Sequence, residues 1–139
     1  MNPKTRTSMV SVGLLVLRLG AGGLLIYGHG WGKLLHFSER AGRFPDPLHM
    51  GPPASLALTV FAEVFCAAAV ALGVATRLAA LALVGLFGVL VFVHHGADPF
   101  KQRELAMIYG VPFLALLLTG PGVYSVDARL GRHLGSGKG

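Results

Sequence analysis

The sequence has few charged residues for its length of 139 residues. Lys, Arg, Asp and Glu together make up 13% of the chain, whereas hydrophobic residues make up 53%, and the mean hydropathy is +0.64. This composition is typical of a polytopic membrane protein rather than of a soluble domain with one buried core. We therefore expect a single membrane domain over residues 1–139, with the lipid bilayer as its surroundings.

Cysteine and the usual metal-binding motifs are almost absent. Cys66 is the only cysteine, so the chain can form neither an internal disulfide nor a CxxC redox pair. The sequence has no HExxH, HxxEH or CxxCH motif, and its histidines lie in loops or next to one another. We predict no metal site and expect interfacial hydrogen bonds from these side chains, which are His29, His36, His94 and His95.

The net charge of +6 comes from Lys and Arg residues scattered through short loops and termini. They form no basic face with interleaved aromatic residues, which argues against nucleic acid as a partner. Anionic lipid headgroups are the partner that this charge pattern favours.

Long apolar runs predict an all-α protein with four transmembrane helices packed as a bundle. The expected spans are about 9–27, 54–75, 78–95 and 103–119, each close to the length that crosses a bilayer core of roughly 30 Å. Residues 28–53 are rich in Gly and Pro, so we expect an interfacial loop with a short helix there. Residues 131–139 are expected to form a flexible tail.

Four spans place both termini on one side of the membrane, in a multi-pass protein. The basic residues outside the spans favour cytoplasmic termini by a narrow margin under the positive-inside rule. The terminal side has Lys4, Arg6, Arg77, Arg129, Arg132 and Lys138, and the other side has Lys33, Arg40, Arg43, Lys101 and Arg103.

Two charged residues, Arg18 and Glu63, lie near the middle of otherwise apolar runs. An isolated charge in lipid is costly, and charges within spans usually face the bundle interior and find partners. Counting back from residue 27 and forward from residue 54 puts both at a depth of roughly 13 Å in a helical hairpin. We therefore predict that they pair. The pair could be an ion pair that fixes helix register. Alternatively, it could be a polar binding site for a quinone headgroup or could take part in a proton-transfer step.

Several segments together resemble the DoxX family of small bacterial four-helix membrane proteins. They are Leu17-Arg18-Leu19, GHGWGKL at 28–34, Glu63 followed by Thr76-Arg77-Leu78, and above all LLLTGPGVYSVDARL at 116–130. The resemblance implies a protein of the bacterial cell inner membrane, since relatives are described as subunits of quinone-linked thiosulfate oxidation or terminal oxidase complexes. Others are described as partners in oxidative-stress complexes, so the expected partners are subunits of a membrane redox complex.

The resemblance and the intramembrane charges together favour a quinone-linked oxidoreductase subunit, with quinone as the expected cofactor. Whether the chain is an enzyme by itself stays open, and the alternatives are a non-enzymatic anchor or assembly subunit and, third, a small transporter. The expected quinone site consists of Arg18, Glu63, His29 and Trp31, and the secondary candidates are Lys33, His94, His95, Glu104 and Tyr109.

Overall fold

A computed structural model describes residues 1–136, and its regular elements are all helices. Several elements join end to end into long continuous helices, which we call rods. The first rod begins at Pro3 and contains α1 (Pro3–Leu25), the π-helical segment η1 (Ile26–Gly30) and α2 (Trp31–Leu35). Its 33 residues give a length of about 50 Å. The prediction that this helix ends at residue 27 is wrong, because Gly30 has helical backbone angles and packs directly against the second rod.

The second and third rods match their predicted spans closely. The second contains α4 (Pro52–Val60), η2 (Phe61–Cys66) and α5 (Ala67–Leu72), and it starts at two prolines and ends at Gly73 with φ of 77°. The third contains α6 (Thr76–Val89) and η3 (Leu90–His94). These two rods and the first are long and apolar enough to cross a membrane. Between the first and second rods lie the short α3 (Phe37–Arg40) and an irregular loop.

The predicted fourth span corresponds to α7 (Phe100–Thr119), a 20-residue helix with Pro112 inside it. It is not among the three helices that qualify as spans by length and composition. The all-helical class is therefore confirmed, while the count of four spans is not. A final helix, α8 (Val126–Ser136), occupies much of the predicted flexible tail, and residues 137–139 of that tail lie outside the described residues.

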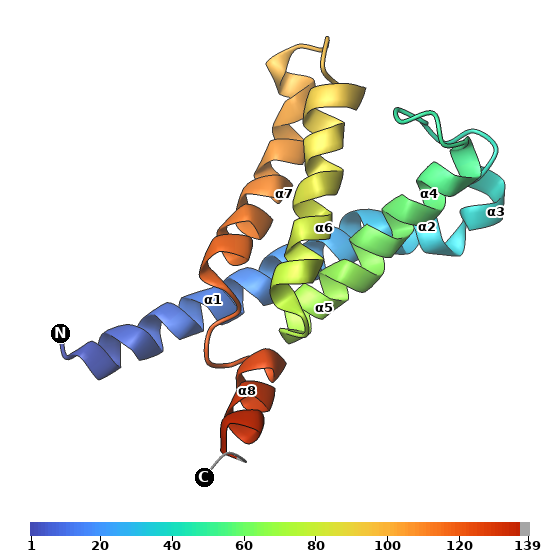
Figure 1. Cartoon of the computed structure of the whole chain (residues 1–139). Helices are drawn as coiled ribbons and strands as arrows, with labels where there is room; N and C mark the ends of the chain where they lie inside the picture. The colour runs from blue at the N-terminus through green and yellow to red at the C-terminus, as the bar shows by residue number, and fades with distance from the viewer. Residues whose placement is uncertain (137–139) are drawn as a thin grey trace.

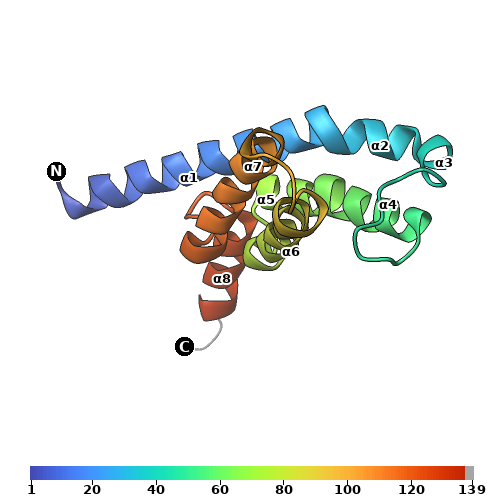
Figure 2. The ribbon, with the colours of Figure 1, turned by 90° about the horizontal axis from the view of Figure 1, so that it is seen from above.

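The helices are arranged as two antiparallel pairs that cross each other. One pair is α1 with α4 and α5, and the other is α6 with α7 (Figure 1). In Figure 2 the first pair runs across the view while α6 and α7 are seen almost end-on. The end of α5 turns directly into the start of α6, and the two pairs contact each other from this turn to the point where they cross.

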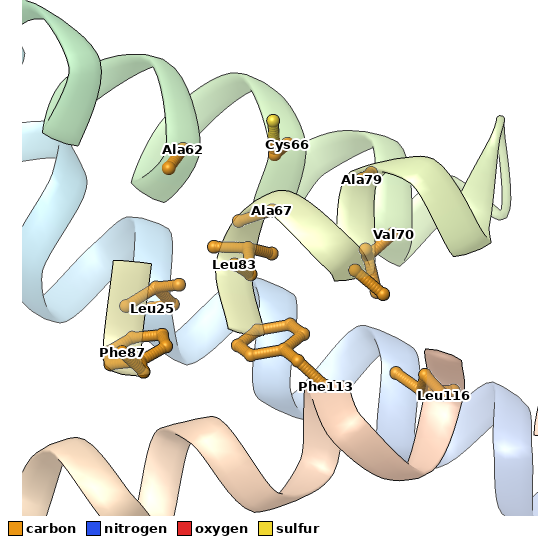
Figure 3. Close-up of a cluster of buried hydrophobic side chains, with 11 residues drawn as sticks. Leu25, Ala62, Cys66, Ala67, Val70, Ala79, Leu83, Phe87, Phe113 and Leu116 are labelled. Atoms are coloured by element: carbon orange, nitrogen blue, oxygen red, sulfur yellow. The ribbon is translucent and has the colours of Figure 1, made fainter. Parts of the chain in front are cut away.

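The hydrophobic core lies where the pairs cross (Figure 3). Phe87 stacks between Phe113, at 6.1 Å between ring centroids, and Tyr109, at 5.8 Å. A Cβ on Gly22 would lie 2.6 Å from the carbonyl oxygen of Ala67, so glycine is what allows α1 to approach α5. Many large apolar side chains face outward, as expected for helices in lipid: Val16, Leu24, Phe65, Leu78, Phe92, Val111 and Leu118.

Candidate functional site at Lys33 and Glu63

Arg18 and Glu63 do not pair in the structure, so this prediction is wrong. The fully buried Arg18 guanidinium donates to the carbonyl oxygens of Ala71, at 3.1 Å, and Tyr124, at 2.5 Å. The Glu63 carboxylate instead accepts from the Lys33 ammonium at 2.5 Å. Lys33 was a secondary candidate in the sequence and is the actual partner of the buried carboxylate.

The error in pairing comes from the position of the loop. Because the first rod continues past Tyr27 to Leu35, Gly30 rather than Arg18 lies beside Glu63. Gly30 is separated from Arg18 by about 18 Å along the helix. The predicted depth of Arg18 assumes that the first helix ends at Tyr27. Because the helix continues to Leu35, Arg18 and Glu63 do not lie at the same level.

The Lys33–Glu63 pair depends on a close approach of the two rods. A Cβ on Gly30 would lie 2.7 Å from the carbonyl oxygen of Glu63 and 2.8 Å from Cγ2 of Val64. One turn beyond Gly30, Lys33 reaches across to the carboxylate. The side chain of Glu63 is 4% exposed and that of Lys33 is 18% exposed, so both charges are largely withdrawn from solvent.

Three π-helical segments surround this ion pair. His29 lies in η1, Glu63 lies in η2 and His94 lies in η3. π-Helical turns are rare, and they occur frequently at functional sites because they redirect side chains from the helical repeat. Each of the three rods thus departs from regular α-helix where it carries a candidate side chain.

Two cavities share the ion pair as a common wall. The larger has a volume of about 400 Å³ and lies between α4 with η2, α6 with η3, and the loop before Pro52. Apart from Lys33, Glu63 and His94 its lining is mainly apolar, with Phe44, Leu58, Phe61, Leu86, Val89 and Leu90 among its residues. Its size falls in the range of pockets that hold small organic ligands.

The smaller cavity has a volume of about 160 Å³ and a more polar lining. Lys33 and Glu63 form one wall, and the rest of the lining combines polar side chains with the apolar Phe87, Leu90, Leu105 and Ala106. The His29 ring meets the Tyr109 ring edge-on at 5.2 Å between centroids. The further polar residues of this lining are His95 and Gln102.

The structure therefore brings together most of the predicted site residues and separates three. Glu63, Lys33, His29, His95 and Tyr109 line the smaller cavity, and His94 joins Glu63 and Lys33 in the larger one. The three residues that line neither cavity are Arg18, the half-exposed Trp31 and the exposed Glu104.

Sequence reasoning missed Asp46, which organises the loop over the larger cavity. Its carboxylate accepts from Ser55 Oγ at 2.6 Å and from the backbone N–H groups of Gly51, at 2.7 Å, and Met50, at 2.9 Å. The hydrogen bond from Ser55, followed by those from Gly51 and Met50, holds the pKa of Asp46 below its usual value. An Asp between two prolines, shortly before a helix start, was the signal in the sequence.

Arg18 belongs to a second polar cluster at the opposite end of the rods. The Asp127 carboxylate accepts from Ala75 N–H, Thr76 N–H and Thr76 Oγ1 at 2.8–2.9 Å, and so caps α6. A Cβ on Gly73 would lie 2.4 Å from the Arg18 guanidinium. The predicted motif GPGVYSVD therefore folds the chain back onto Arg18 and the α5–α6 turn.

Comparison with known proteins agrees with this architecture. The sequence profile of DoxX matches residues 13–96, which is more than half of the chain. The chain belongs to the DoxX family. This DoxX protein is a membrane protein by that match and by its three membrane-competent helices. The matched region includes Arg18, Lys33 and Glu63 but ends before the motif at 116–130. No curated protein and no solved structure matches the chain.

No cluster of three or more His, Cys, Asp or Glu side chains within residues 1–136 could hold a metal ion. The titratable side chains at the site are the Lys33–Glu63 ion pair, the imidazoles of His29, His94 and His95, and the phenol of Tyr109. These groups bind and exchange protons.

Proposed function

We propose that this DoxX protein is the membrane subunit of a quinone-linked oxidoreductase complex. In this proposal the quinone headgroup binds beside Lys33 and Glu63, in the larger cavity. The observation that carries the proposal is an apolar cavity of about 400 Å³ with one buried ion pair in its wall. A quinone combines an apolar body with two carbonyl oxygens, and this combination suits such a cavity.

Within that cavity few polar groups are free to bind a headgroup. The Ser55 hydroxyl already donates to Asp46, and the Thr59 hydroxyl donates to the carbonyl of Ser55. Lys33 can donate to a quinone carbonyl, and Glu63 can accept from the hydroxyl of the reduced form. The third polar side chain in the lining is His94.

The two electrons of the quinone–quinol conversion are exchanged with a partner protein in this proposal. A quinone becomes a quinol by gaining two electrons and two protons, and the reverse step releases them. In the proposal the electrons come from, or go to, the redox centre of a partner oxidoreductase. This chain supplies the binding site, and Glu63 exchanges protons with the headgroup.

Binding can be measured with the single tryptophan of the chain. Trp31 lies two residues before Lys33, and a quinone bound nearby should quench its fluorescence. Titration with a short-chain ubiquinone analogue should give saturable quenching in the wild type. Lys33→Met should weaken binding by tenfold or more, because it removes the donor to a quinone carbonyl. Glu63→Gln should weaken it to a similar extent, because the Lys33 ammonium loses the carboxylate that holds it at the cavity wall.

Tyr27→Phe is the matched control, since Tyr27 is 88% exposed and lines neither cavity. Saturable quenching that is equal in the wild type, Glu63→Gln and Lys33→Met would reject this site. A wild type that binds no quinone but co-purifies with an oxidoreductase would favour the anchor or assembly role instead.

We also propose that α7 is a fourth span and that both termini are cytoplasmic, in the bacterial inner membrane. Support comes from its 20 residues and from its antiparallel packing along α6 (Figure 1). In a Cys66→Ala background, Gly42→Cys and Gly131→Cys should react with a membrane-impermeant thiol reagent from opposite sides. Neither added Cβ meets a neighbour. Labelling of both from the same side would mean that α7 does not cross.

A further inference from the structure

We infer that the smaller cavity carries protons between Glu63 and the aqueous phase at the α6–α7 turn, an inference that rests on the proposed quinone site. The larger cavity offers a bound headgroup only three titratable side chains, which are Lys33, Glu63 and His94. Of these, Lys33 and Glu63 also line the smaller cavity. A proton that moves between the two cavities therefore passes the ion pair.

The smaller cavity is lined by side chains that can form a proton path. The groups that face His29 there are Lys33, Glu63 from η2, His95 from the turn after η3, and Tyr109 and Gln102 from α7. Its volume of about 160 Å³ has room for several water molecules between these groups. An imidazole ring has one nitrogen that donates and one that accepts a hydrogen bond, so His29 and His95 can link water molecules into a chain.

The outer end of the path reaches the surface at the α6–α7 turn. The side chain of His95 is 29% exposed, and its Nδ1 lies 2.8 Å from Oδ2 of Asp98. Gln102, in the first turn of α7, is exposed as well. The path therefore runs from the 4% exposed carboxylate of Glu63, past His29, to His95 at the surface.

The proton balance of the step is simple. When the bound quinone takes two electrons from the reduced centre of the partner oxidoreductase, each of its two oxygens gains one proton. In our inference the Glu63 carboxylate takes up each proton from the aqueous phase through His95 and His29 and passes it to the quinone, so that it is a carboxylate again after each of the two transfers. In quinol oxidation the same protons leave along the same groups, and the electrons pass to the oxidised centre of the partner.

The test uses the complex purified with its native partner. His29→Ala and His95→Ala should lower the rate of quinone turnover by tenfold or more and leave quinone affinity, read from Trp31 fluorescence, within twofold. Added imidazole should restore part of the rate, and the solvent deuterium isotope effect should rise in both variants. His133→Ala is the matched control, because this exposed histidine of α8 lines neither cavity.

The outcomes separate the two proposals. Absence of quinone binding in the wild type would overturn the quinone site itself. Normal binding with wild-type turnover in both histidine variants would overturn the proton path alone. Loss of turnover without imidazole rescue and with an unchanged isotope effect would also overturn the path, because it would indicate a purely structural role.

Discussion

Lys33 and Glu63 should behave as one energetic unit, whereas Arg18 and Glu63 should not. Lys33→Met leaves the Glu63 carboxylate, 4% exposed, without its cation. Removing one partner of a buried ion pair costs about 3–5 kcal/mol of unfolding free energy. Glu63→Leu should cost less, about 1–2 kcal/mol, because Lys33 is 18% exposed and its flexible stem can carry the ammonium to water. The structure thus predicts an asymmetry between the two single variants.

The double variant Lys33→Met/Glu63→Leu removes both charges and should be nearly neutral. It should therefore be more stable than the sum of the single variants predicts, with a coupling free energy of about 4–7 kcal/mol, the sum of the two single costs. The free energy of unfolding can be measured by titrating the purified protein in mixed micelles with a denaturing detergent, with helical circular dichroism as the signal.

The control cycle pairs Arg18→Leu with Glu63→Leu. These residues share no hydrogen-bond partner, and about 18 Å of the first rod separates Arg18 from Gly30, which lies beside Glu63. We therefore expect additivity within about 0.5 kcal/mol. A coupling between Arg18 and Glu63 as large as that between Lys33 and Glu63 would refute the assignment of partners. So would a Lys33–Glu63 coupling below about 0.5 kcal/mol.

Three further predictions concern substitutions of Gly30, Asp127 and Asp46. Gly30→Ala should destabilise the protein by about 1–3 kcal/mol and weaken quinone binding, because its Cβ would meet Glu63 O at 2.7 Å, whereas Gly32→Ala, which meets nothing, should preserve binding. Asp127→Asn should cost about 1–3 kcal/mol in the same unfolding assay, because an amide that accepts from Thr76 at Oδ2 turns its NH2 group toward Ala75 N–H, which then loses its acceptor. Burial alone would raise the pKa of Asp127, but bonds from Thr76 and Ala75 and the charge of Arg18 bring it below its usual value. Its stabilisation should therefore be full above about pH 4 and be lost as the pH falls through the lower folded pKa, and Asp127→Asn should lack that loss. Asp46→Ala should leave the rods helical by circular dichroism and raise proteolysis at residues 41–51, because it removes three hydrogen bonds from the loop; unchanged cleavage there would contradict this.

The helices themselves could be predicted because their sequence signals are local. Proline at the start of α4, Gly73 at the end of α5 and Gly120 at the end of α7 mark boundaries that the structure keeps. The continuation of the first rod through GHGWGKL could not be predicted in this way. Glycine disfavours helix in isolation, and only the close contact of Gly30 with Glu63 on another rod explains why the helix persists.

The candidate site was predicted in part for a similar reason. The buried carboxylate could be found from its sequence alone, since a charge in an apolar run requires a partner. The identity of that partner depends on the register between two rods and therefore on where the first rod ends. From the sequence Lys33 is only a secondary candidate, yet it lies where the π-helical segments of the first and second rods meet.

The two buried charges, Arg18 and Glu63, differ in the space around them. This difference distinguishes a charge that stabilises the fold from one that lies beside a candidate binding site. Around Arg18 the chain is closed, because Gly73 packs against the guanidinium and the backbone carbonyls of Ala71 and Tyr124 accept its hydrogen bonds. This cluster holds α1, the α5–α6 turn and the C-terminal segment together. Around Glu63 the three rods, together with α7 and the loop before Pro52, leave two cavities that share the Lys33–Glu63 ion pair, one mainly apolar and one more polar. A buried charge that only fixes helix register needs no cavity beside it. The two cavities next to Glu63 are therefore where a ligand would bind and exchange protons with the protein.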